Sequence, residues 1–258
     1  MKENGSSVEY VLRSGARTSV LRAVVEGCDS TQALLDSGLA SESAVYNALT
    51  ELDERDLIHS PDQKRWYPTG AGTVVADLIE RQRETETVLE SAPEYWRRHD
   101  VTALPTAFRE RLADLAGGEV VRATETRPSR AVREIERRLH DADSVSVITP
   151  IYNERFDHAA RGEGLRLVLD TGVLEDLMDE ADEESDEDVG AVRVADVPFA
   201  LTVTDDCVLL SLPTLDGAYD PRTEFVVESE RARQWGMELF ERYWAEARSP
   251  EEFLAAHQ

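Results

Sequence analysis

The chain has 258 residues, of which 41% are hydrophobic and 7% aromatic, which is enough for two modest domains or one large domain with a buried core. This composition excludes a disordered chain, and no run approaches the ~20 apolar residues that a membrane helix needs. Its net charge is −25, from 53 acids against 28 bases. The N-terminus shows no apolar signal-peptide core, so we expect a cytoplasmic protein without a membrane partner.

The bases are unusual in kind, because only Lys2 and Lys64 are lysines and the rest are arginines. An acidic, lysine-poor surface is typical of proteins from concentrated salt, where a Debye length of roughly 3 Å screens self-repulsion. We therefore expect a halophilic protein. An ordinary acidic protein encoded by a GC-rich genome is the alternative.

Residues 6–27 predict two helices, and the stretch from Ser30 to Pro68 predicts two further helices and a β-hairpin. Ser30 is suited to cap the first helix of this stretch and Gly38 to end it, while Ser41 opens the second. The turn SPDQKR separates two short apolar pairs. Helix, turn, helix and hairpin in this order predict a winged helix-turn-helix, which places one helix in the major groove of DNA. A helical bundle shares the helical pattern but does not explain the hairpin.

The polar side of the second helix and the hairpin tip supply the expected DNA contacts. Asn47 suits a bidentate contact to adenine, and the Ala44 methyl group suits contact with a thymine methyl. Base-reading candidates are Ser41, Ser43, Ala44, Tyr46, Asn47 and Thr50, and phosphate-binding candidates are Arg17, Gln63, Lys64 and Arg65. The alternative is that Asn47 and Thr50 only face solvent and that Tyr46 packs on the hairpin.

The charge of this segment weighs against DNA without excluding it. Residues 1–75 carry seven bases and eleven acids, whereas the remaining chain carries 21 bases and 42 acids. Most DNA-binding domains are basic. In concentrated salt, however, counterion release contributes little, so base and shape contacts must provide more of the affinity.

A long helix is expected from Thr69 to about His99, interrupted at Pro93. Its apolar positions fall on one face, and its middle is polar. We expect it to link the DNA-binding domain, residues 1–75, to the next module through residues 76–100, and to pair with its twin in a homodimer. A plain spacer helix would show the same pattern.

From residue 101 onward, helices alternate with short apolar strands, including SVSVITP, GLRLVLD, FALTVTD, CVLLSLP and TEFVVES. This alternation predicts an α/β domain over residues 101–258, with a largely parallel sheet and an antiparallel edge. A final helix is expected from Ser229 to Ala247. The segment 175–188, in which ten of fourteen residues are acidic, predicts a solvated loop rather than a calcium site.

Enzyme signatures are missing from the sequence. It contains no GxGxxG, Walker P-loop, GxSxG or HExxH motif, and its five histidines, His158 among them, have no partner at motif spacing. Cys28 and Cys207 lie far apart in no metal or redox spacing, so we expect free, buried thiols. The sequence therefore predicts no catalytic residues, metal site or cofactor.

The segments RTSVLRAVVEGCDSTQALLDSGLASESAVYNALTELDERDLI and WYPTGAGTVVADLIE resemble the winged-helix regulators of halophilic archaea. DADSVSVITPIYNERF, GLRLVLDTGVLEDLM, VPFALTVTDDCVLLSLPTLDG and ARQWGMELFERYWAEA resemble the middle domain of the archaeal methanogenesis/filament regulatory protein family. That domain is similar in outline to those of TrmB-type regulators, which share a phospholipase-D-like fold. The catalytic His-x-Lys of that superfamily is absent here. The resemblance implies a two-domain, dimeric transcription regulator whose hydrolytic chemistry is lost.

A ligand is expected at the carboxyl ends of the parallel strands. The candidate residues there are Thr149, Tyr152, Asp170, Thr171 and Phe199. Alternatively, Asp170 and Thr171 only cap a helix and Tyr152 only packs. Together these patterns predict a sequence-specific DNA-binding transcriptional regulator with an effector-sensing or assembly domain. The alternatives are a winged-helix protein–protein scaffold that does not bind DNA and a residual phosphodiesterase.

Overall fold

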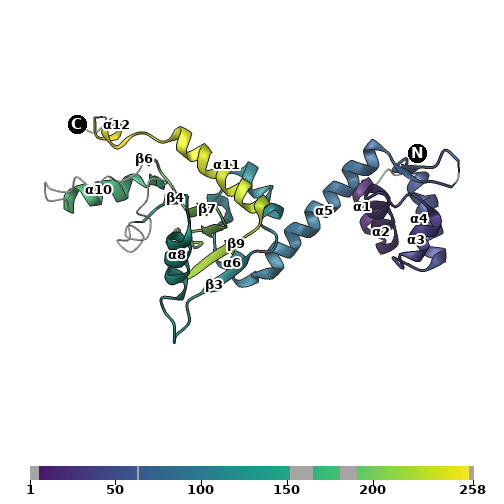
Figure 1. Ribbon diagram of the computed structural model, residues 1–258, viewed down its shortest axis with the longest axis horizontal. Helices are drawn as coiled ribbons and strands as arrows, with labels where there is room; N and C mark the ends of the chain where they lie inside the picture. Colours follow the sequence, from purple (N-terminus) through teal and green to yellow (C-terminus); the bar gives the residue numbers. More distant parts are fainter. Residues whose placement is uncertain (1–5, 63, 152–164, 181–190, 256–258) are drawn as a thin grey trace. The chain divides into compact units, whose positions relative to one another are not determined.

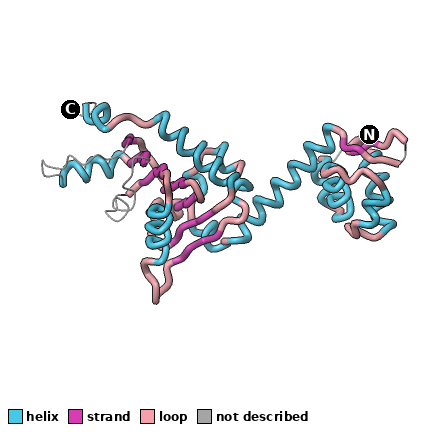
Figure 2. The backbone as a smooth tube through the Cα atoms, viewed as in Figure 1, coloured by secondary structure: helices cyan, strands magenta, loops and turns pink. Residues whose placement is uncertain are grey.

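The computed structural model describes residues 6–62, 64–151, 165–180 and 191–255. In it the chain divides into two compact units, Met1–Arg83 and Glu84–Gln258, which we call unit 1 and unit 2. Helices and sheets are both present in the described chain, which confirms the expected α/β class (Figures 1 and 2). Gln63, Tyr152, His158 and most of the acidic segment lie outside the described residues.

The described part of unit 1 contains four short helices, a hairpin and the start of a long helix. The four helices are α1 (Ser7–Leu12), α2 (Gly15–Val25), α3 (Thr31–Asp36) and α4 (Glu42–Asp53). The antiparallel hairpin pairs β1 (Ile58–His59) with β2 (Tyr67–Pro68), and the long helix α5 spans Gly70–Ser91. The Ser30 hydroxyl accepts a hydrogen bond from the Ala33 amide, and Gly38 has φ +66°, so the start and the end of α3 follow the sequence prediction.

The core of unit 1 is formed by apolar positions that recur every three or four residues. Leu21 from α2 and Val45, Leu49 and Leu52 from α4 are at most 2% exposed. The first turns of α5 join this core through Val75 and Ile79. α4 therefore buries one of its sides in this core and leaves the other side exposed to solvent.

Unit 2 contains a seven-stranded sheet in the order β3-β9-β8-β7-β4-β5-β6. The strands are β3 (Glu119–Arg122), β4 (Val145–Thr149), β5 (Leu165–Leu169), β6 (Ala191–Val194), β7 (Ala200–Thr204), β8 (Val208–Ser211) and β9 (Thr223–Val227). Among the described strands, only the β4–β5 and β5–β6 pairs are parallel, and the other four are antiparallel. The expectation of a largely parallel sheet is therefore wrong. The hairpin β7–β8 extends the sheet from β4, and β9 and β3 continue it antiparallel.

Helices pack on both faces of this sheet (Figure 1). The remaining helices of unit 2 are α6 (Pro93–Arg98), α7 (Thr106–Arg109), α8 (Arg130–Asp141), α10 (Thr171–Glu180), α11 (Glu230–Glu246) and α12 (Pro250–Ala255), with 3-10 turns at Val101–Ala103 and Leu112–Leu115. Along β8, Val208 and Leu210 belong to the core under α11, whereas Leu209 belongs to the core under α8. This alternation explains why the whole strand is apolar.

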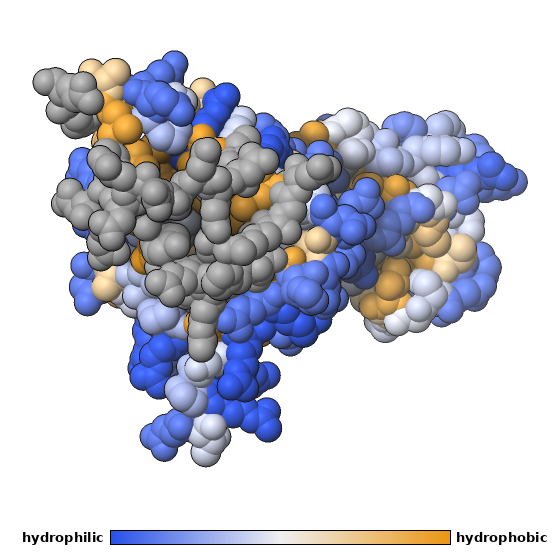
Figure 3. Space-filling view, turned by 60° about the vertical axis from the view of Figure 1, so that its left-hand side comes forward, coloured by the Kyte–Doolittle hydropathy of each residue, from blue (hydrophilic) through white to orange (hydrophobic). Residues whose placement is uncertain are grey.

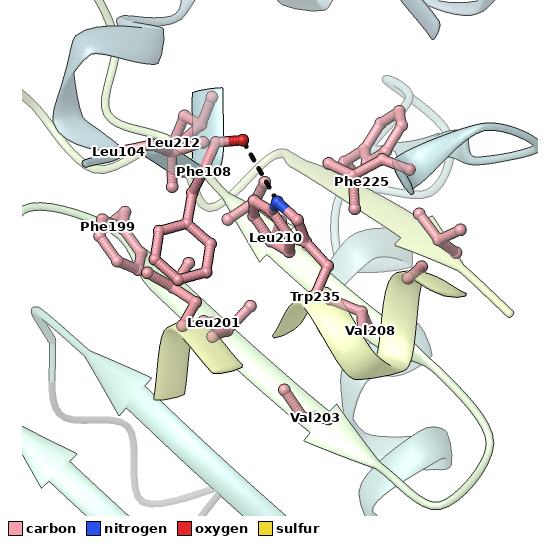
Figure 4. Close-up of a cluster of buried hydrophobic side chains, with 14 of the residues drawn as sticks. Leu104, Phe108, Phe199, Leu201, Val203, Val208, Leu210, Leu212, Phe225 and Trp235 are labelled. Carbon is pink, nitrogen blue, oxygen red and sulfur yellow. Dashed lines mark hydrogen bonds between the residues drawn. The ribbon is translucent and has the colours of Figure 1, made fainter. Parts of the chain in front are cut away.

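Trp235 of α11 is the largest side chain of the main core and is fully buried (Figure 4). Its indole nitrogen donates to the Phe108 carbonyl over 3.2 Å, and the two rings meet edge to face at 5.6 Å. Tyr95 of α6 is equally buried, and its hydroxyl accepts from the Leu212 amide. The segment expected as the end of a linker helix thus packs in the core of unit 2.

Candidate nucleic-acid interface

The outward side of α4 carries the polar residues that the sequence predicts as base readers. Ser43, Asn47 and Thr50 are exposed, and Tyr46 is 49% exposed. Ala44 is half-buried. Tyr46 therefore presents much of its ring to solvent instead of being buried under the hairpin.

The start of this helix leaves polar groups available. Ser41 precedes the helix in an extended conformation, and its hydroxyl makes no cap hydrogen bond to the helix backbone. It lies 3.4 Å from the Ser43 hydroxyl. Backbone amides at such a helix start favour an anionic partner, because the first turn of a helix has unpaired donors.

The hairpin tip is shaped by Asp62, whose carboxylate accepts hydrogen bonds of 3.0 Å from the Lys64 and Arg65 amides. These bonds lower the pKa of Asp62, which therefore stays ionised and holds the turn. The Lys64 side chain is exposed and contacts no described residue in an ion pair. Arg65 lies 3.8 Å from the Asp29 carboxylate, a distant and exposed pair.

The hairpin is attached to the start of α3, which fixes its position within unit 1. The Trp66 amide donates to the Asp29 carbonyl over 2.7 Å, and its indole donates to the Thr31 hydroxyl over 3.0 Å. Gly72 brings α5 against the same region, since a Cβ atom there would lie 1.8 Å from the Leu57 carbonyl oxygen. Only glycine permits this approach.

Arg17 does not lie free on this surface. Its guanidinium pairs with Glu51 of α4 over 2.8 Å, and its side chain is only 12% exposed. It also stacks at 3.8 Å on the Tyr10 ring, which Arg55 contacts at 3.5 Å. Arg17 therefore joins α1, α2 and α4, and the expected phosphate contact is replaced by a structural one.

In unit 2, the residues expected to bind a ligand are only partly brought together. Asp170 accepts hydrogen bonds from the Gly172 and Val197 amides, and Thr149 bonds within its own turn. Phe199 is fully buried against the Tyr243 ring, so a ligand cannot reach it. Thr171 lines a cavity.

That cavity has a volume of about 460 Å³ and lies where β5 and β6 end. Besides Thr171, its lining includes Asp196, Tyr243 and Arg248, and the Thr171 hydroxyl donates to Asp196 over 2.8 Å. The sequence located the strand ends correctly, but it gave no signal that α11 and the following turn would supply the other walls. We call this space the strand-end cavity.

The fold and these surfaces describe a two-unit α/β protein with an exposed helix–hairpin surface in unit 1. Residues 128–246 match the family model described as "Methanogenesis regulatory protein FilR1, middle domain". A curated relative, the methanogenesis regulatory protein FilR1 of Methanothrix harundinacea (strain 6Ac), is 25% identical over 225 residues, covering 81% of this chain. The chain spans 50% of the length of that relative.

Two solved structures are similar in part. The archaeal chromatin protein TrmBL2, whose structure is described as showing a novel mode of DNA binding, matches with 16% identity over 94% of this chain and 98% of that one, at a TM-score of 0.39. The calicheamicin-biosynthesis methyltransferase CalO1 matches with 14% identity over 74% and 62%, at a TM-score of 0.25. Likenesses at these scores say nothing about function. Among the described residues, no helix is both long and apolar enough to span a bilayer.

Proposed function

We propose that this protein is a sequence-specific, DNA-binding transcriptional regulator, in which unit 1 is a winged helix-turn-helix and α4 is the recognition helix. The observation that carries the proposal is the exposed row Ser43, Asn47 and Thr50 beside a hairpin whose tip holds Lys64. A helix with one polar side exposed and a basic hairpin next to it is the arrangement that reads a major groove. The relative named a regulatory protein supports a regulatory rather than an enzymatic role.

The DNA contacts divide into two kinds. Asn47 is assigned to base recognition, because its amide can donate and accept at adenine. Lys64 and Arg65 are assigned to phosphates, which position the protein without reading sequence. The remaining polar face of α4, Ser41, Ser43, Tyr46 and Thr50, completes the base-facing surface.

The test begins with chromatin mapping of the tagged protein, which supplies a cognate duplex. Gel shifts in multi-molar KCl then compare wild type with N47A, K64A and the control R13A, which also removes one positive charge. Asn47→Ala should weaken cognate binding about 5- to 150-fold and reduce discrimination, as loss of a bidentate base contact does. Lys64→Ala should weaken cognate and random duplexes equally.

The control variant alters Arg13, which lies at the end of α1 and pairs with Glu9 at an exposed position. Equal affinity of all four proteins for the mapped duplex would refute the contact assignment. Absence of any footprint at every salt concentration, with co-purification of a protein partner, would instead support the scaffold alternative. The exposed acids Glu42 and Asp53 of α4, and Glu54 directly after it, are the feature that favours this second candidate.

We further propose a homodimer formed through α5 and effector binding at the strand-end cavity. Val74 and Leu78 lie four residues apart on α5 and are 58% and 48% exposed, which is the pattern of a helix face that pairs with another helix. The cavity combines an aromatic wall with charged groups and has the size of small-molecule sites. The effector proposal is tested by a thermal-shift screen of small molecules against wild type and Glu175→Gln. This variant alters an exposed residue in the lining of the strand-end cavity.

A further inference from the structure

A second cavity, of about 420 Å³, lies where the loop after β3 meets the first turns of α8. Four of the side chains that line it are arginines: Arg127, Arg130, Arg133 and Arg137. We call it the arginine pocket. The loop and the start of α8 form a hydrophilic projection at the bottom of the space-filling view (Figure 3).

The charge of this region is opposite to that of the chain. Residues 122–138 carry six arginines and three glutamates, whereas the whole protein has a net charge of −25. Both basic clustering and a concave surface are present at one place. In a protein with so many carboxylates, arginines without acidic partners mark a site where a negative ligand replaces those partners.

Ion pairing within the pocket is incomplete. Arg137 bonds Glu134 over 2.6 Å, and the neighbouring Arg138 pairs with the same carboxylate. Arg127, Arg130 and Arg133 are exposed, and none of them pairs with a described carboxylate. Three guanidinium groups that line one cavity repel one another, and an anion that bridges them removes that repulsion.

The backbone contributes in the same direction. Ser129 precedes α8 without capping it through its side chain, and the Arg130 amide donates to the Arg127 carbonyl, so the Ala131 and Val132 amides are the first-turn donors left over. Such amides and the helix dipole favour an anion. A guanidinium group binds phosphate oxygens in bidentate fashion, and linked phosphates offer enough oxygens for several arginines. A single carboxylate would pair with only one of the three arginines.

We propose that the arginine pocket binds a small molecule that carries two or more linked phosphate groups. Its volume falls in the range of small-ligand sites. A duplex is disfavoured because its phosphates continue at about 1.7 Å per charge and would meet the exposed Glu125, next to the lining Thr126, and the exposed Asp141, which pairs with Arg137. The proposal does not depend on DNA binding by unit 1.

Isothermal titration with inorganic triphosphate tests this site on the full chain, at the lowest KCl concentration at which circular dichroism shows the protein folded. Wild type should bind one triphosphate per chain, and R130A/R133A should weaken binding at least tenfold, since each lost charge-assisted hydrogen bond alone accounts for about tenfold. Arg130→Lys/Arg133→Lys should restore part of the triphosphate affinity that R130A/R133A loses. Lysine keeps the positive charge but cannot make the bidentate hydrogen bonds of a guanidinium group. The control R97A removes an exposed arginine of α6 that pairs with Glu94, and should leave the affinity unchanged.

A second arm uses a labelled duplex of random sequence under the same conditions. Unchanged duplex affinity in R130A/R133A, together with weakened triphosphate binding, supports the proposal. No triphosphate binding by wild type, equal affinity of wild type and R130A/R133A, or equal weakening by R97A overturns it. Loss of duplex affinity with unchanged triphosphate binding would also overturn it and would identify a DNA contact instead.

Discussion

Replacing Glu224 by glutamine should change how the stability of unit 2 depends on pH. Glu224 lies in β9, is 4% exposed, and accepts a 2.7 Å hydrogen bond from the Ser211 hydroxyl. Burial raises the pKa of Glu224 to about 8, against an ordinary value of 4.5. Glutamine keeps an oxygen acceptor for Ser211 and cannot ionise.

The sign follows from the two pKa values. The folded state holds the Glu224 proton more tightly than the unfolded chain, so protonation stabilises the fold. This contribution is complete below about pH 4.5 and is lost as the pH rises through about 8. At about 1.4 kcal/mol per pKa unit, the loss between pH 5 and pH 8 amounts to roughly 3 to 4 kcal/mol. A domain with a total stability of about 5–15 kcal/mol would register this clearly.

Urea unfolding monitored by tryptophan fluorescence measures the effect, because Trp96, Trp235 and Trp244 all lie in unit 2. Wild type and E224Q are compared from pH 5 to pH 8 at one KCl concentration. The difference between their unfolding free energies should increase in favour of E224Q across this range, while the titration of other carboxylates cancels. Parallel curves for the two proteins would refute a buried, protonated Glu224.

Three further predictions concern packing. Gly72→Ala should destabilise unit 1 by about 2 kcal/mol or more, because its Cβ would overlap the Leu57 carbonyl, whereas Gly70→Ala in the same helix has open space and should be neutral or stabilising in urea unfolding. Trp235→Ala should cost about 3–5 kcal/mol in the same assay, because it leaves a large cavity and removes a hydrogen bond to the Phe108 carbonyl, and a loss below 1 kcal/mol would contradict the packing in Figure 4. Leu78→Glu should convert the proposed dimer to a monomer in light scattering with circular dichroism unchanged, and a dimer that persists would exclude α5 as the interface.

Local sequence patterns determined most element positions. Caps and glycines set the limits of α3, the apolar spacing set the buried side of α4, and continuous apolar runs marked β8 as covered on both faces. These signals depend on neighbours within a few residues, and such interactions are written directly in the chain. The exposed face of α4 followed from the same periodicity.

The order of the strands could not be obtained in this way. β3 pairs with β9, about a hundred residues later, and β7 lies antiparallel to β4. The sheet is therefore mostly antiparallel, although the alternation of helices and strands in the sequence predicts parallel pairing. Which edges pair depends on how both faces of the sheet are covered, and the sequence of one strand does not record this.

The charged residues show the same division. A glutamate in a strand normally faces water, but β9 lies between β3 and β8, which leaves Glu224 buried. Arg17 was expected at a phosphate and is bound to Glu51 on another helix. The arginines of α8 show in the sequence only as an amphipathic helix, and the cavity arises because the β3–α8 loop folds beside them. The chain by itself specified which side chains are polar, and the tertiary structure decided which of them are paired, buried or left for a ligand, because pairing depends on distances between segments far apart in sequence.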